Sequence, residues 1–233
     1  MSRFALITAA VLLATALSSG SAHAQGRWEP YVTGLAGGGS TPAFGINFND
    51  PSLAAALTIK DRKFAPGATI GGSFGVWRTS SGRRVRWGLR GEVAYQDSNG
   101  QAQTVQASGT LFGLPYNGPL QVPQIDAAAM FYTGTFLIGW QMGGKTATGQ
   151  VMPYAGLGGG IDRVTARQDT MRGHAVGGTA QGVAGVAFGT SRTTSAYVEY
   201  RFTRAQQTLP IGTQTSVFSI TPNQLVAGFM LGW

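Results

Sequence analysis

The sequence predicts an all-β fold, an eight-stranded antiparallel β-barrel that spans a membrane. Three observations lead to this prediction: a strictly alternating C-terminal segment, a composition rich in glycine and poor in charge, and a rhythm of long and short connections. The alternating segment places five residues on one apolar face: Leu225, Ala227, Phe229, Leu231 and Trp233. Successive side chains of a strand point to opposite sides, and a last strand with a terminal aromatic is typical of barrel closure at a lipid–water interface.

Residues 1–24 are predicted to form a secretory signal peptide. Arg3 supplies a positive start, residues 4–17 are almost unbroken in apolar character, and Ala22-His23-Ala24 is a small-x-small cleavage site. The alternative, a membrane anchor, is disfavoured because the apolar stretch is short. Cleavage would leave residues 25–233 as one outer-membrane barrel domain. The chain contains no cysteine, which excludes lipoprotein anchoring and disulfides.

The composition fits a barrel better than a soluble protein. Glycine accounts for 36 of 233 residues, and only 11% of residues are charged, against about 7% and about 25% in ordinary proteins. No run of 18 apolar residues follows the leader, which excludes a helical membrane protein. The net charge of +8 does not gather in one basic helix or stripe, so no nucleic acid is expected as a partner.

Eight strands account for the region after the leader. They are predicted at residues 28–38, 65–77, 84–96, 127–141, 151–164, 175–188, 194–202 and 217–233. The connections alternate between long and short, and the two longest, 39–63 and 97–125, contain many turn-forming residues. Outer-membrane barrels have long external loops and short periplasmic turns. A lipocalin-like soluble barrel is the alternative.

The charged residues of the strands at 84–96 and 194–202 alternate with apolar residues. A charge that faced lipid at mid-depth would cost roughly 2–4 kcal/mol, so the charged faces must point inward. Five residues are expected to form one interior cluster: Arg86, Arg90, Glu92, Glu199 and Arg201. Guanidinium groups that hold carboxylates ionised favour a polar plug that closes the barrel. An ion constriction or a paired-carboxylate acid/base site are the alternatives.

Other basic residues fall near the predicted external rim, where they could meet lipopolysaccharide phosphates. They are Lys60, Arg62, Lys63, Arg163, Arg167 and Arg172. A rim that is merely solvated is the alternative interpretation of the same residues. The long connections 39–63 and 97–125 are the places where a host or environmental ligand is expected to bind.

No catalytic, cofactor or metal site is predicted. His174 is the only histidine left after cleavage of the leader, and neither Asp169, Thr170 nor Ser191 has a diagnostic spacing from it. Zinc is improbable with one histidine and no cysteine, and the aspartates lack the dense spacing of a calcium loop. The glycines of residues 156–160 lie within a strand and lack a following Lys-Ser/Thr, so they indicate close packing rather than phosphate binding.

Three segments resemble a family of small outer-membrane barrels. Residues 28–35 (WEPYVTGL), 153–160 (PYAGLGGG) and 197–202 (YVEYRF) are similar to the opacity-protein-like, OmpA-type eight-stranded group often labelled the porin family. The resemblance implies an outer-membrane location and recognition of the last strand by the assembly machinery. The function expected is a structural and surface-interaction role. A narrow porin-like channel, which the family label implies, is the alternative, and a lipid A-modifying enzyme is the third hypothesis.

Overall fold

A computed structural model describes residues 27–79, 84–143, 149–168, 171–211 and 214–232. Several residues discussed above lie outside these ranges. They are the signal peptide 1–24, Asp169 and Thr170, and the terminal Trp233.

The described chain is almost entirely β-structure, with one short 3-10 helix, η1, at Pro51–Leu53. The strands are β1 Arg27–Ser40, β2 Phe44–Asp50, β3 Ala55–Arg62, β4 Gly67–Thr79, β5 Val85–Gly100, β6 Gln103–Leu111, β7 Leu114–Val122, β8 Ile125–Trp140, β9 Val151–Gln168, β10 Met171–Gly189, β11 Thr194–Ile211, β12 Gln214–Ile220 and β13 Asn223–Gly232. No helix in the described ranges is long and apolar enough to cross a membrane.

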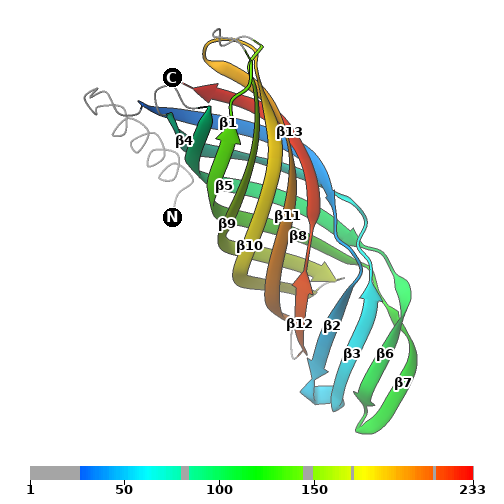
Figure 1. The fold of residues 1–233 in the computed structure, drawn as a ribbon. Helices are drawn as coiled ribbons and strands as arrows, with labels where there is room; N and C mark the ends of the chain where they lie inside the picture. The colour runs from blue at the N-terminus through cyan, green and yellow to red at the C-terminus, as the bar shows by residue number, and fades with distance from the viewer. Residues whose placement is uncertain (1–26, 80–83, 144–148, 169–170, 212–213, 233) are drawn as a thin grey trace.

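Eight of these strands form a closed antiparallel ring, which confirms the predicted fold class. Their order is β10-β9-β8-β5-β4-β1-β13-β11, and an additional pairing between β10 and β11 closes the ring. β13 pairs with β1 on one side and with β11 on the other, so it is the strand that completes the wall. Figure 1 shows the ring in the upper part of the molecule, with the strands tilted around it.

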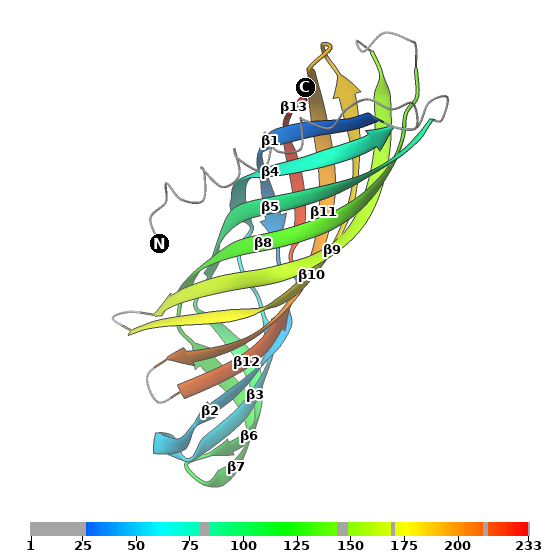
Figure 2. The ribbon, with the colours of Figure 1, turned by 90° about the vertical axis from the view of Figure 1, so that its left-hand side faces the viewer.

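The turn-forming residues of the two long connections suggested irregular loops, but both connections contain strands. Residues 39–63 contain β2 and β3, and residues 97–125 contain β6 and β7. With β12, these strands continue the sheet beyond the ring in the order β12-β2-β3-β6-β7. We call these five strands the extension; it projects from the end of the barrel opposite the start of β1 (Figures 1 and 2).

The last predicted strand, 217–233, is also divided. β12 ends at Ile220 and β13 begins at Asn223, so the break falls at Thr221 and Pro222. Proline has no N–H to donate to a strand neighbour, which favours a break at this position. The carbonyl of Pro222 still accepts a hydrogen bond from the Thr203 N–H at 3.0 Å. This break allows β12 to join the extension while β13 closes the ring.

The outer surface of the ring is apolar, as a lipid-facing wall requires. Large side chains that point outward and are 46–64% exposed include Leu89, Phe136, Ile138, Val198, Phe202 and Phe229. Near the end where β1 begins, the Trp28 and Trp87 rings meet edge to face with centroids 5.1 Å apart. The Arg78 guanidinium lies over both rings, at 5.5 and 5.6 Å. Aromatic and basic side chains in such a band are typical of the headgroup level of a bilayer.

The interior is filled by side chains, and glycines on the inner face of β9 make the close packing possible. A Cβ on Gly156 would lie 2.6 Å from Leu137 Cδ2, and one on Gly158 would lie 2.7 Å from Thr135 Oγ1. Only hydrogen fits at these positions. The glycine-rich segment therefore serves packing, as its sequence suggested.

Candidate functional site in the barrel lumen

The lumen is built in layers, and one layer near the start of β1 is aromatic. Tyr31 stacks on Trp77 with ring centroids 6.2 Å apart, and Trp77 meets Tyr154 edge to face at 6.3 Å. Leu137 and Val226 complete the same buried cluster. Sequence reasoning missed this layer; the available signal was the alternation of β1 and β4, which places Tyr31 and Trp77 on the inner face.

Next to the aromatic layer, four ionised side chains form a buried cluster that we call the ion plug. It consists of Arg90 and Glu92 of β5 with Glu199 and Arg201 of β11. The Arg90 Nη1 donates to Glu199 Oε2 at 2.6 Å and its Nη2 to Glu199 Oε1 at 3.1 Å, a bidentate pair. The Arg201 Nε donates to Glu199 Oε1 at 2.6 Å, and its Nη1 donates to Glu92. Glu199 and Arg201 are 0% exposed.

The ion plug crosses the whole lumen. In the ring of strands, β5 and β11 are separated by β4, β1 and β13 on one side and by β8, β9 and β10 on the other. They are therefore opposite walls, and side chains from both meet in the middle. The two positive and two negative charges balance, so each ion is compensated in a region where an unpaired charge would be costly. This arrangement joins opposite walls to one another across the lumen.

Arg86, which was expected in the same cluster, lies elsewhere. Its Nη1 donates to Glu29 Oε2 at 2.7 Å, and this pair is only partly buried. Arg86 precedes Arg90 by four residues, about 13 Å along a strand at roughly 3.3 Å per residue. Alternation placed Arg86 on the correct face but could not give its depth, so the expectation of one five-residue cluster is corrected to four residues.

Two polar pairs between strands that are not adjacent in the ring lie further along the lumen. The Gln224 Nε2 of β13 donates to Gln96 Oε1 of β5 at 2.7 Å. The Gln207 amide of β11 donates to Asp162 Oδ2 of β9, and both residues are buried. Asp162 is one of the aspartates that the sequence places in or near the external loops and that lack the spacing of a calcium loop; it is 0% exposed inside the barrel.

The predicted rim cations divide into two groups. Lys60, Lys63, Arg163, Arg167 and Arg172 are exposed. Arg62 is only 3% exposed, and its Nη2 donates to the Pro123 carbonyl at 2.8 Å. Burial lowers the pKa of Arg62 from its ordinary value. Its expected contact with lipopolysaccharide is corrected accordingly, because the side chain is buried.

The residues considered for catalysis or metal binding are dispersed. His174 lies within β10, is exposed, and is the register partner of Thr165. The buried Asp50 caps η1, where its Oδ1 accepts from the Ser52 N–H at 3.0 Å. In the ranges that the structure describes, no group of three or more His, Cys, Asp or Glu side chains is close enough to hold a metal ion.

β13, the strand that completes the ring, presents the apolar face that was expected. Leu225, Ala227, Phe229 and Leu231 point outward and are exposed, while Val226 is 1% exposed in the interior. Gly228 of the same strand lies close to β1, since a Cβ there would be 2.0 Å from the Gly34 carbonyl oxygen. The outward apolar face and the two-sided pairing fit an element that closes the barrel.

No protein-family model matches the sequence, and a comparison with curated proteins finds no relative. Among solved structures, the chain is similar to Neisserial surface protein A (11% identity, TM-score 0.44, 87% of this chain and 96% of that chain). It is also similar to the outer membrane protein OprG from Pseudomonas aeruginosa (13%, 0.48, 88% and 95%). The outer membrane protease OmpT from Escherichia coli is similar too (8%, 0.41, 93% and 100%). At TM-scores below 0.5 these likenesses say nothing about activity, and the barrel is established by its own strand pairing.

Proposed function

We propose that the protein is a closed outer-membrane barrel with a structural and surface-interaction role. The observation that carries this proposal is the ion plug, which joins opposite walls through four buried charges. An open pore would be lined by hydrated side chains, whereas each of these buried ions is paired with an ion of opposite charge. The apolar belt supplies the fit to a bilayer, and the outer membrane is where closed barrels of this kind are found.

The extension is the part of the protein that we propose meets the surroundings. Four of its strands, β2, β3, β6 and β7, lie within residues 39–63 and 97–125, the segments where a host or environmental ligand was expected. The exposed cations Lys60, Lys63, Arg163, Arg167 and Arg172 are proposed to face lipopolysaccharide phosphates. The outward face of β13 is proposed to be the feature that the outer-membrane assembly machinery recognises.

We do not propose an enzymatic activity such as lipid A modification for this chain. His174 is exposed and sits on a strand. Neither a carboxylate nor a hydroxyl that would activate it is hydrogen-bonded to it in the described part of the chain. An unchanged lipid A composition in cells that express His174→Ala is the expected result, and a changed composition would point to an enzyme.

Conductance in planar lipid bilayers tests the closed lumen. The native protein is expected to give no stable unit current, because the plug crosses the lumen. Arg90→Ala removes the bidentate partner of Glu199 and is expected to raise conductance. Arg86→Ala is the matched control, because it also removes an arginine from β5 but leaves the plug intact. Well-resolved unit currents from the native protein would instead support the narrow channel.

A further inference from the structure

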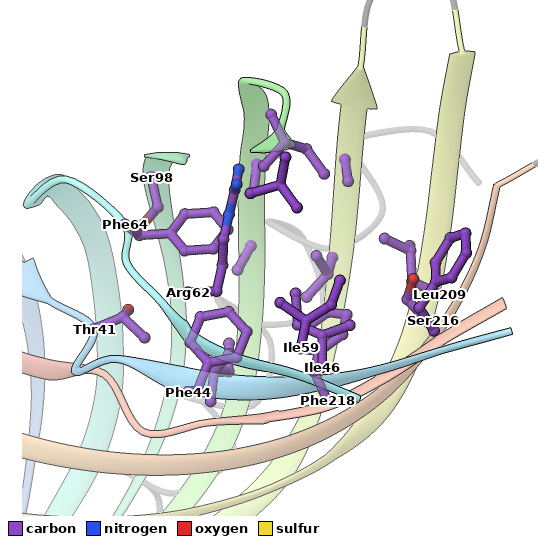
Figure 3. A pocket seen from close by; sticks show the side chains of 18 of the residues that line it. Thr41, Phe44, Ile46, Ile59, Arg62, Phe64, Ser98, Leu209, Ser216 and Phe218 are labelled. Carbon is purple, nitrogen blue, oxygen red and sulfur yellow. The ribbon is translucent and has the colours of Figure 1, made fainter. Parts of the chain in front are cut away.

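A cavity of about 290 Å³ lies where the extension covers the mouth of the barrel. Its walls are largely apolar. Ile46, Ile59 and Phe218 contribute from the extension, and Ala129, Phe131 and Leu209 contribute from the inner face of the barrel. Figure 3 shows side chains from β2, β3 and β12 gathered on one side of the cavity, with Leu209 of β11 beside them.

One charged side chain, Arg62, lines this apolar cavity. It is 3% exposed, and its Nη2 donates to the carbonyls of Pro123 at 2.8 Å and Gly100 at 3.4 Å. The Nη1 is buried and has no hydrogen-bond partner. No carboxylate in the described part of the chain forms a salt bridge with Arg62. Its guanidinium lies 6.0 Å from the centroid of the Phe64 ring.

A buried guanidinium without an anion is energetically unfavourable, since its remaining N–H groups have lost water and gained no acceptor. The ion plug of the same protein illustrates the usual solution, in which every buried guanidinium meets a carboxylate. Guanidinium groups bind carboxylates through short, charge-assisted hydrogen bonds. The position of Arg62 therefore calls for an anionic oxygen, and the walls around it call for an aliphatic chain.

From this combination we propose that the cavity is a binding site for a medium-chain aliphatic carboxylate. Its carboxylate accepts hydrogen bonds from Arg62, and its chain lies among Ile46, Ile59, Phe218 and Leu209. The volume holds on the order of ten groups the size of a water molecule or a methylene, at roughly 30 Å³ each. A chain of about ten carbons fits this space, and pockets of this size and apolar lining are typical of small-molecule sites.

Equilibrium dialysis of radiolabelled decanoate against the protein in zwitterionic lipid nanodiscs tests the proposal, with empty nanodiscs subtracted for partition into lipid. Decanol, which has the same chain and no charge, is the matched probe. We expect decanoate to bind the native protein about ten-fold or more tightly than decanol, as lost hydrogen bonds to a charged group predict. Equal binding of both probes, or no decanoate binding above empty nanodiscs, would overturn the proposal.

Two variants locate the site. Arg62→Met keeps the chain length and removes the charge, so it is expected to weaken decanoate about ten-fold and leave decanol unchanged. Ala129→Phe fills the cavity from β8 and is expected to abolish binding of both probes. A heat-dependent shift on a detergent gel reports that each variant is folded. If Arg62→Met does not fold, Ala129→Phe and the comparison of the two probes decide the matter; native-like decanoate binding by folded Ala129→Phe would exclude this cavity.

Discussion

Removal of Arg201 is the most informative perturbation of the ion plug. Arg201 is fully buried and donates to both Glu199 and Glu92. In Arg201→Met these two carboxylates share a single guanidinium, that of Arg90. Removing one partner from a buried ion pair costs about 3–5 kcal/mol, because an uncompensated charge stays behind. We expect the free energy of unfolding to fall by that amount.

Arg86→Met provides the comparison within the same protein. Arg86 forms a pair of similar length with Glu29, but the two side chains are 17% and 33% exposed. Pairs that are accessible to water contribute about 1 kcal/mol or less. The expected difference between the two variants is therefore about 2–4 kcal/mol. It arises from the burial of Arg201 and from its second carboxylate partner, since the substitution is the same in both.

Urea titration of the protein refolded into phospholipid vesicles measures both values, with the fluorescence of the five tryptophans as the signal. Arg201→Met leaves one carboxylate charge uncompensated, and adding Glu92→Gln removes that charge and restores a neutral plug. We expect this double variant to be more stable than the sum of the two single effects predicts. If Arg201→Met costs no more than Arg86→Met, the four charges do not act as a buried, mutually compensated cluster.

Two further predictions concern packing and the lipid surface. Gly160→Ala would place a Cβ 1.9 Å from the Tyr132 carbonyl oxygen, whereas a Cβ in Gly34→Ala meets nothing within 4 Å. Urea titration should show that the free energy of unfolding falls by roughly 1–3 kcal/mol in Gly160→Ala and changes little in Gly34→Ala. Equal stabilities of the two variants would contradict the packing account. The double variant Arg163→Gln/Arg172→Gln should lose much of the thermal stabilisation that lipopolysaccharide vesicles give the native protein, and added salt should reduce that stabilisation. Arg84→Gln, an exposed site at the opposite end of the barrel, should retain it; a loss of the same size there would indicate non-specific attraction.

The wall of the barrel was predictable because lipid imposes a severe rule on it. Charged residues cannot face hydrocarbon, so alternation alone placed Glu92 and Glu199 inside and Leu89 and Val198 outside. Depth was not predictable in the same way. Arg86 and Arg90 share a face, but only the register of β5 against β4 and β8 shows that they belong to different layers.

The extension escaped prediction because its sequence carries the residues of loops. Pro115 and Pro119 both lie in β7, which is the last strand of the sheet order. An edge strand tolerates proline, since one side of it needs no hydrogen-bond partner. The cavity was not predicted either. Arg62 was assigned to the exposed rim, and nothing local in the sequence shows that β2, β3 and β12 cover the mouth of the barrel.

The central claim is that the barrel is closed by charges that bridge opposite walls. Single-channel recording from the native protein and from Arg90→Ala, in the same planar bilayers, tests it most directly. The account predicts a silent native protein and a measurable current from Arg90→Ala, with Arg86→Ala silent like the native chain. Stable unit currents from the native protein, unchanged in Arg90→Ala, would contradict it.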